Sequence, residues 1–475
     1  MRCMASAPNS RCAREVTRCD AGSASVYCAS PNGNWRVVSA QNANQQRTRA
    51  SFSWPFVISV GVLGFASGLP NVLLNDTLSA WLSDIGVDPK SIGLLAFATL
   101  PYGLKLLWAP VLDRFPAPLF GFLGIRRSWI ALLCAMLFIA VLALAWVGPS
   151  TQAAPVLPVA IVALAVACLS ATLDAAIDAH RTDGAAGVAE GAAASAFVMG
   201  YRVAFVSIGA LILMLVAPLA HWVDPNGDAH ARELAWRALI ASGGAVMLIG
   251  IVAAWLAPSP PARIAVQSVE AAVIEPLRSF VRAFGSRIAI VLVVALLFRL
   301  PDLLGNRMVM PFLKQEIGFT IDEIGAVRQG FGFVMTIVGA LVGGVCVQRF
   351  GLFRSLLVFG CFQVASNAGY IVLAGAGKSM PTFVGVILVE NLCNGLVSAA
   401  FVAYFMELCE PRFAAAQYAI LSGLMYLAGA LVGGVSGWLV EELGYDKFFL
   451  LSILVGVPPL ALLPFAMPKR AEAAD

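Results

Sequence analysis

The sequence has little charge for its length. Asp, Glu, Lys and Arg make up 12% of its 475 residues, against about 25% in soluble proteins. The basic residues are scattered along the chain, without the basic block that binds nucleic acid. This composition excludes a soluble globular enzyme, a disordered chain and a disulfide scaffold, and it predicts no nucleic-acid partner.

Signatures of enzymes and metal sites are also missing. The three histidines, His180, His221 and His230, do not form a metal set, and the four cysteines before residue 30 have no zinc spacing. The chain has no Gly-x-Ser-x-Gly motif and no phosphate-binding glycine loop. We therefore expect no enzymatic activity, no metal and no cofactor, and any transport must be driven by a gradient or a partner.

Long apolar stretches fill the chain after Phe52. They run past about 18 residues, as membrane-spanning helices do, whereas barrel strands alternate over about 10. The predicted fold class is an all-α polytopic membrane protein. Pro70, Pro101, Pro301 and Pro311 lie inside these stretches and predict kinks. The twelve predicted spans are 54–83, 90–112, 128–148, 156–180, 192–220, 234–257, 286–313, 322–347, 353–375, 381–408, 413–440 and 446–466.

Lys and Arg near the span ends predict the orientation. With the N-terminus inside, most of them fall in inside loops, and the outside loops hold Lys90, Arg232, Lys314, Lys378 and Lys447. Basic residues concentrate on the cytoplasmic side of membrane proteins. We therefore expect both termini to be cytoplasmic.

These boundaries divide the chain into a disordered cytoplasmic tail at 1–50, an N-terminal six-helix bundle at 51–257, a cytoplasmic connector at 258–285, a C-terminal six-helix bundle at 286–467 and a cytoplasmic tail at 468–475. The first tail is polar and lacks the apolar core of a signal peptide. In the connector, Val269, Val273, Leu277, Phe280 and Phe284 recur at helical spacing. They predict an amphipathic helix on the membrane surface.

The two bundles repeat short motifs. Leu82-Ser-Asp-Ile-Gly86 followed by Ile92-Gly93 is similar to Gln315-Glu-Ile-Gly318 followed by Ile324-Gly325. Asp113-Arg114-Phe115 is similar to Gln348-Arg349-Phe350, and an Arg-Ser pair follows each. Matches in the same order at the same span ends indicate two pseudo-symmetric halves. Two six-helix halves joined by a cytoplasmic connector are the architecture of the major facilitator superfamily, whose substrate site lies between the halves.

Ten ionisable residues fall inside the predicted spans: Asp76, Asp174, Asp178, Asp302, Glu390, Lys105, Arg202, Arg299, Arg307 and Arg328. Facing lipid, each would cost about 2.5–3.5 kcal/mol, and ten would cost about 25–35 kcal/mol. That exceeds the usual net stability of a protein, about 5–15 kcal/mol. They must face a polar interior or one another, and ion pairs that serve only packing and gating remain the alternative to a binding site.

The placement of these charges favours a site for a polar cargo. Asp174 and Asp178 share a face of the fourth span, and Arg299 and Asp302 share a face of the seventh. Spans one, four, seven and ten line the central cavity of the superfamily's fold, and they hold the densest polarity. We assign the substrate and proton pathway to Asn71, Asn75, Asp76, Lys105, Asp174, Asp178, Arg202, Arg299, Asp302, Asn306, Glu390, Asn391 and Asn394.

Coupling uptake to a proton gradient requires a carboxylic acid that alternates in protonation. Burial favours the neutral form of such an acid and brings its titration toward the working pH range. Asp76, Asp302 and Glu390 are the three candidates, and the sequence leaves the choice among them open.

The loop after the second span resembles the superfamily's cytoplasmic gating motif. Its arginines are also explained by membrane topology alone. Gln348 stands where the first half has Asp113, so we expect weaker gate pairing in the second half. The predicted gating residues are Asp113, Arg114, Arg126, Arg127 and Arg349.

Several segments resemble the AmpG-type muropeptide permeases. The most specific is Trp108-Ala-Pro-Val-Leu-Asp113. The others are Phe65-Ala-Ser-Gly-Leu-Pro70, Leu78-Ser-Ala-Trp-Leu82, Ala171-Thr-Leu-Asp-Ala-Ala-Ile-Asp-Ala-His-Arg181, Gly339-Ala-Leu-Val-Gly-Gly344, Phe401-Val-Ala and Ala416-Gln-Tyr-Ala419. Asp174 and Asp178 match the two acids of the family's fourth-span motif, and Arg299 stands where the family has Lys. The chain departs from that motif at Leu173, usually Gln, and at His180, usually Tyr.

The resemblance implies a proton-coupled importer, monomeric by our expectation, in the inner membrane of a Gram-negative bacterium. Its cargo would be N-acetylglucosamine–anhydro-N-acetylmuramic acid, with or without stem peptide. This cargo feeds peptidoglycan recycling and, in some species, signals β-lactamase induction. Two alternatives are a related transporter of acetyl-coenzyme A or a siderophore, and a non-transporting membrane assembly factor. The buried charges argue against the assembly factor.

Overall fold

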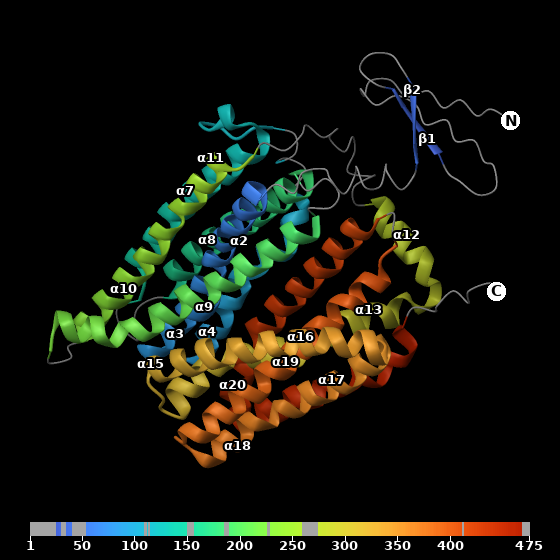
Figure 1. Cartoon of the computed structure of the whole chain (residues 1–475). Helices are drawn as coiled ribbons and strands as arrows, with labels where there is room; N and C mark the ends of the chain where they lie inside the picture. The colour runs from blue at the N-terminus through green and yellow to red at the C-terminus, as the bar shows by residue number, and fades with distance from the viewer. Residues whose placement is uncertain are drawn as a thin grey trace.

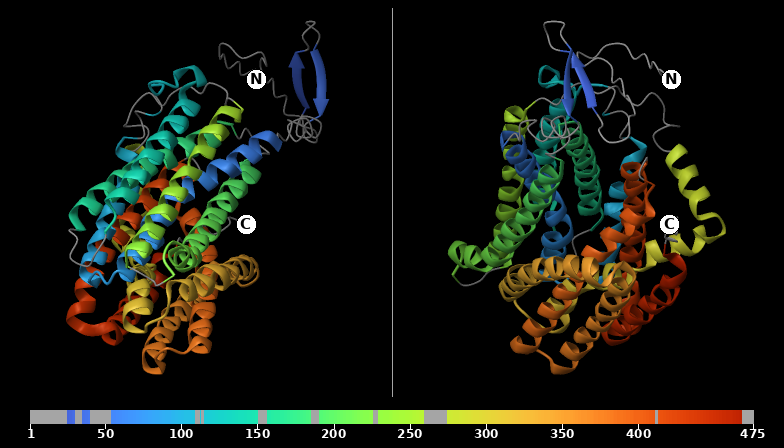
Figure 2. Two further views of the ribbon diagram at one scale, coloured as in Figure 1. Left: turned by 90° about the vertical axis from the view of Figure 1, so that its left-hand side faces the viewer. Right: turned by 45° about the vertical axis from the view of Figure 1, so that its right-hand side comes forward.

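The computed structural model of the chain describes residues 25–29, 35–39, 54–108, 112, 115–149, 156–184, 190–225, 229–258, 274–410 and 413–467. Nearly all of these residues are helical, and the helices gather in two groups (Figures 1 and 2). The first half runs from α2 to α11 and the second from α13 to α20. The predicted all-α fold with two helical bundles is confirmed.

The first half begins with α2 (Trp54–Val72), which continues through the π-helix η1 (Leu73–Thr77) into α3 (Leu78–Asp84). The elements that follow are α4 (Pro89–Leu94), η2 (Leu95–Thr99), α5 (Leu100–Leu104), η3 (Lys105–Leu107), η4 (Gly121–Leu123), α7 (Ile125–Val147), α8 (Val156–Gly184), α9 (Glu190–Val223), α10 (Ala229–Val246) and α11 (Leu248–Leu256).

The second half follows the short helix α12 (Glu275–Phe284). Its elements are η7 (Gly285–Arg287), α13 (Ile288–Leu297), α14 (Leu300–Pro311), the π-helix η8 (Phe312–Glu316), α15 (Ile321–Ile324), the π-helix η9 (Gly325–Phe331), α16 (Gly332–Phe350), α17 (Leu352–Ser366), α18 (Ala368–Ala376), α19 (Met380–Leu408) and α20 (Ala414–Ala466). We call the end of the bundles where α3 and η8 stop the α3 end, and the opposite end the α12 end.

Two features reconcile the described helices with twelve spans. Ten helices among the described residues are long and apolar enough to cross a membrane. The second span is divided into α4, η2, α5 and η3, so no single helix there reaches that length. The last two spans are joined in α20, and they separate at Gly444, where φ is 76°.

Breaks in the helices lie at the predicted prolines. Pro101 and Pro301 stand in the first turns of α5 and α14. The backbone N–H groups of a first turn have no hydrogen-bond partner within the helix, so proline removes no helical hydrogen bond there. Pro311 ends α14 directly before η8, and Pro70 lies in α2 shortly before η1. Proline removes a donor and clashes with the preceding turn, so the helix changes its hydrogen bonding there.

The sequence repeats have the same local structure in both halves. Gly86 and Gly318 have φ of 80° and 84°, in the left-handed region that glycine enters without strain. Gly124 and Gly351, each with φ of 85°, precede α7 and α17 in the same way. The described repeats therefore support pseudo-symmetric halves.

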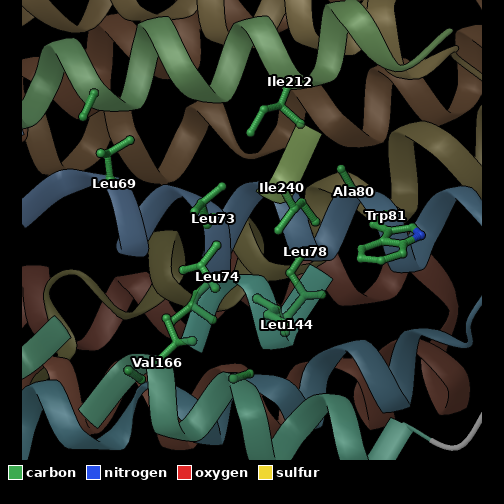
Figure 3. Packing of buried hydrophobic residues seen from close by; sticks show 14 of the residues in the cluster. Leu69, Leu73, Leu74, Leu78, Ala80, Trp81, Leu144, Val166, Ile212 and Ile240 are labelled. Carbon is green, nitrogen blue, oxygen red and sulfur yellow. The ribbon is translucent and has the colours of Figure 1, made fainter. Parts of the chain in front are cut away.

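The hydrophobic core joins the halves at the α3 end. Leu73, Leu78 and Trp81 of the first span pack among Leu144 of α7, Val166 of α8, Ile212 of α9 and Ile240 of α10 (Figure 3). The same cluster continues into second-half residues such as Phe312, Phe319 and Phe449. A second cluster lies within the second half and includes Phe280 of α12. Buried apolar contact between the halves is thus concentrated at the α3 end.

The connector forms an amphipathic helix where its described part begins. In α12, Phe280 is buried, whereas Leu277 and Val281 are exposed beside the charged Arg278 and Arg282. This pattern suits the predicted place at a membrane surface. Residues 259–273 of the connector lie outside the described residues.

The segment predicted to be disordered contains two strands. β1 (Ser25–Ala29) pairs antiparallel with β2 (Trp35–Ser39), and Tyr27 lies opposite Val37. Both strands are rich in Val and aromatic residues, which favour extended backbone. The prediction of a wholly disordered tail is therefore wrong for these strands, and the rest of 1–50 lies outside the described residues.

Candidate functional site

Two helices of the first half bring a charged cluster together. Lys105 Nζ lies 3.9 Å from Asp178 Oδ2, and Arg181 Nη2 lies 3.2 Å from the other oxygen of that carboxylate. One turn away on α8, Asp174 accepts a hydrogen bond from Ser67 of α2 and interacts electrostatically with Lys105. The two acids predicted to share a face of α8 therefore meet the same lysine.

Aromatic residues connect this first-half cluster to the second half. The Tyr102 hydroxyl donates to Ser170 Oγ at 2.8 Å, and its ring stacks on Tyr426 of α20 at 6.0 Å. Asp174, Lys105 and Arg202 all lie near Tyr426. Arg202 is exposed on α9, and its nearness to Tyr426 of α20 places it on the side facing the second half.

A second cluster surrounds the break between α13 and α14. Arg299 Nε lies 3.3 Å from Asp302 Oδ2, as the i,i+3 spacing predicts. Arg299 also donates from Nη1 to Ser398 Oγ at 2.9 Å and from Nη2 to Asn394 Oδ1 at 3.4 Å. Discontinuous spans of this kind present polar groups near the membrane midplane in transporters. Arg299, Asp302 and Asn394 therefore form one polar surface, to which sequence reasoning had not assigned Ser398.

Glu390 occupies the same side of α19. Its Oε2 accepts a hydrogen bond of 2.9 Å from Asn391 Nδ2. Asn391 Oδ1 in turn accepts from Thr336 Oγ1 of α16 at 3.0 Å. Asp302, Arg299 and Arg328 all interact electrostatically with Glu390. Glu390 is thus tied to the charged groups of the second half and not isolated in lipid.

An ion pair between η9 and η1 links the two halves. Arg328 Nη1 of η9 lies 3.3 Å from Asp76 Oδ1 of η1, and both side chains are mostly buried. Arg328 Nη2 also donates to Asn306 Oδ1 at 2.5 Å. Arg307 interacts electrostatically with Asp76 and packs beside Gly433 of α20. The assignment of site residues from sequence omitted Arg328 and Arg307, although both were recognised as buried charges.

Asn71 and Asn75 contact each other beside this pair. Asn75 Nδ2 donates to Asn71 Oδ1 at 2.7 Å and to its backbone oxygen at 3.1 Å. The hydrogen bond to the Asn71 backbone oxygen crosses the transition between the two helices, because Asn71 belongs to α2 and Asn75 to η1. π-Helical turns are frequent at functional sites.

A further polar cluster closes the α3 end. The Asp84 side chain is 1% exposed and receives Arg232 at 2.6 Å and Lys314 Nζ at 3.0 Å. Trp236 Nε1 donates to the same carboxylate at 2.9 Å. Sequence reasoning missed this cluster because Arg232 and Lys314 were counted as outside-loop charges. The available signal was the repeated Leu-Ser-Asp-Ile-Gly segment that contains Asp84.

Backbone contacts strengthen this closure. Gln315 Nε2 of η8 donates to the carbonyls of Ser83 at 3.2 Å and Val87 at 2.9 Å. Gly437 of α20 packs directly on the backbone of Pro89 and Lys90. Lys314, Gln315 and Gly437 belong to the second half, so the halves meet here through charge, hydrogen bonds and close backbone packing.

The three predicted gating residues that the structure describes, Arg126, Arg127 and Arg349, contact groups in their own halves. Arg126 donates to Asp183 at 2.8 Å, and Arg127 donates to the carbonyls of Ala254 at 2.8 Å and Trp255 at 2.6 Å. The Arg349 guanidinium lies 5.9 Å from the Phe350 ring. Asp113 and Arg114 lie outside the described residues. A gating role for this set stays a prediction.

Comparison with known proteins agrees with this architecture. The family model described as Major Facilitator Superfamily matches residues 56–434. The chain is 38% identical over 404 residues to the anhydromuropeptide permease of Escherichia coli strain K12, covering 85% of this chain and 78% of that protein.

Solved structures agree on the fold. A bacterial homologue of the human lysosomal transporter Spinster aligns with a TM-score of 0.65 at 15% identity, covering 87% of this chain and 97% of that one. A D-xylose–proton symporter aligns with a TM-score of 0.64 at 14% identity, covering 88% and 99%. These matches are transporters and not enzymes.

Proposed function

Because this chain belongs to the Major Facilitator Superfamily, in the group of the anhydromuropeptide permeases, we propose that it is a proton-driven importer of anhydromuropeptides. The cargo is N-acetylglucosamine–anhydro-N-acetylmuramic acid, with or without stem peptide. The observation that carries the proposal is the identity to the Escherichia coli permease over most of both chains. Import of this cargo serves peptidoglycan recycling and, in species with an inducible enzyme, β-lactamase induction.

The second-half cluster suits an anionic, hydroxyl-rich cargo. The Arg299 guanidinium can bind a carboxylate bidentately, and Asn394 and Ser398 lie within its hydrogen-bonding network. Such groups replace the water that a sugar loses on entering the protein. Arg307 and Arg328 both interact with Asp76, so this group carries a net positive charge.

The two departures from the family motif do not remove groups from these clusters. Leu173 is fully buried in the hydrophobic core. His180 is fully buried at the α12 end of α8, and its ring lies 5.9 Å from Phe56. Both positions are part of the packing of α8, so the polar residues Asp174 and Asp178 keep their surroundings.

Orientation and location are part of the same proposal. The positive-inside pattern puts the α12 end in the cytoplasm and the α3 end in the periplasm of an inner membrane. The closed α3 end then corresponds to a protein shut toward the periplasm. We propose that the monomer works alone, since each half supplies part of one shared set of charges.

Glu390 is our choice for the proton carrier. Asp76 and Asp302 each form an ion pair with an arginine at 3.3 Å. Glu390 accepts a hydrogen bond from Asn391 and faces the like charge of Asp302. Among the described residues, protonation of Glu390 therefore breaks no ion pair, whereas protonation of Asp76 or Asp302 breaks one.

Complementation tests the cargo. A permease-deficient bacterium that expresses this chain is given radiolabelled anhydromuropeptide, with and without a protonophore. The proposal expects uptake that the protonophore abolishes. Uptake of a labelled siderophore or of acetyl-coenzyme A, without muropeptide uptake, would overturn the cargo, whereas uptake insensitive to the protonophore would overturn the coupling.

A further inference from the structure

Arg328 interacts with carboxylates of both halves. Asp76 of the first half is its ion-pair partner at 3.3 Å. Glu390 of the second half interacts with it electrostatically. A single guanidinium can neutralise either carboxylate fully, but not both at close range, so the two compete for it.

Close packing holds Asn391, the neighbour of Glu390, against the start of α16. Gly332, four residues after Arg328, has no side chain, and a Cβ there would lie 2.9 Å from Asn391 Nδ2. The Asn391 carboxamide is thereby held between Thr336 and Glu390 at 3.0 and 2.9 Å. The α19 backbone is thus fixed against the start of α16, directly after the segment that carries Arg328.

Both members of the interhalf pair stand on π-helical turns. Asp76 lies in η1 and Arg328 lies in η9, where the i→i−4 bonding of the flanking α-helices is interrupted. A change between π- and α-helical turns rotates the following side chains relative to the preceding ones. Arg328 can therefore be turned toward a new partner without displacing a whole span.

We propose that Arg328 changes partner during transport. It holds Asp76 across the interface while the α3 end is closed, and it turns to Glu390 within its own half when that end opens. This inference deepens the proposed proton-driven transport and rests on it for its role in the cycle, but the exchange itself is measurable without cargo.

Because of this exchange, protonation of Glu390 affects the Arg328–Asp76 ion pair between the two halves. A proton from water forms an O–H bond at Glu390 and cancels the charge that competes with Asp76. Its return to water restores the competition. The other titratable or charged groups that face Glu390 are Asp302 and Arg299, Tyr370 of α18 and Cys393 of α19. Arg307 is the further charge facing Asp76.

The test measures conformation in the full-length protein, reconstituted in nanodiscs without cargo. Fluorescent unnatural amino acids replace Phe122 of the first half and Phe350 of the second, which are 75% and 56% exposed at the α12 end. Energy transfer between them reports the ratio of the α3-closed to the α3-open population. The control is Glu323→Gln, because Glu323 pairs with Lys378 inside the second half at 3.1 Å.

The two carboxylate variants are expected to act in opposite directions. Glu390→Gln raises the α3-closed to α3-open ratio and Asp76→Asn lowers it, each by about 5- to 150-fold, the usual range for coupled sites. The ratio of the unmodified protein rises as pH falls, and that of Glu390→Gln does not change with pH. Shifts in the same direction, or no shift in either variant, overturn the proposal.

A double variant with the two charges swapped replaces Asp76→Asn if that variant does not fold. If Asp76→Asn is not monodisperse, Asp76→Arg combined with Arg328→Asp replaces it. The proposal expects this double variant to keep the α3-closed population, and it expects Glu390→Gln no longer to raise that population, since a carboxylate at position 328 repels Glu390. A rise of the α3-closed population on Glu390→Gln in the double variant overturns the exchange. Failure of muropeptide uptake with opposite shifts intact overturns the cargo only.

Discussion

Lys314 of the second half lies 3.0 Å from the carboxylate of Asp84 in the first. Asp84 is almost wholly buried and is also held by Arg232 of its own half. A buried carboxylate left without part of its compensation is costly. The closed α3 end therefore depends on a charge that the second half brings and must withdraw when the end opens.

Lys314→Met is expected to loosen the α3 end. It removes the cation that joins the halves, while Arg232 and Trp236 still compensate Asp84 within the first half. Hydrogen–deuterium exchange of the peptides around 81–88 and 312–318 should be faster than in the unmodified protein. Lys378→Met is the matched control, since its partner Glu323 lies in the same half. Equal exchange in all three proteins would show that the pair does not hold the halves together.

Gly437→Ala is expected to prevent close packing of α20 on α4. A Cβ at Gly437 would collide with the backbone of Pro89 and Lys90, which cannot rotate away as a flexible side chain can. Overpacking of this kind costs about 1–3 kcal/mol. The yield of a disulfide between cysteines introduced at Ser83 and Gln315 should fall in a background without native cysteines. Gly344→Ala is the control, because a Cβ there meets nothing within 4 Å, and an equal yield in both variants would contradict this prediction.

Arg299→Gln is expected to weaken cargo binding. It removes the guanidinium that pairs with Asp302 and donates to Ser398 and Asn394. Hydrogen bonds to charged groups contribute about 1.5–3 kcal/mol, so the Kd for anhydromuropeptide should rise about 10- to 150-fold in calorimetry. Arg354→Gln, at an exposed position of the same half, should bind normally. Normal binding by a monodisperse Arg299→Gln protein would remove Arg299 from the site.

The number of spans and their breaks could be predicted from the sequence. Apolar length is a local property, and each predicted proline lies at or near a change in helical hydrogen bonding. The contact of Arg299 with Asp302 was also predictable, because i,i+3 residues are neighbours on any helix. Local spacing sufficed in each case.

Contacts between the halves could not be predicted in this way. Arg328 and Asp76 are far apart in the chain, and their pairing depends on how α14, η9 and η1 pack. Lys314 and Arg232 looked like outside-loop charges, since no local pattern shows that they converge on Asp84. The π-helical turns that carry Asp76 and Arg328 have no sequence signature that we could apply.

Transport in proteoliposomes tests the central claim most directly. Purified protein is reconstituted with an imposed pH gradient, and the uptake of radiolabelled N-acetylglucosamine–anhydro-N-acetylmuramic acid is followed with and without nigericin. We predict accumulation above the external concentration that disappears in Glu390→Gln and on collapse of the gradient. Accumulation that is unchanged in Glu390→Gln and without a gradient, or no muropeptide uptake by a folded protein, would contradict the account.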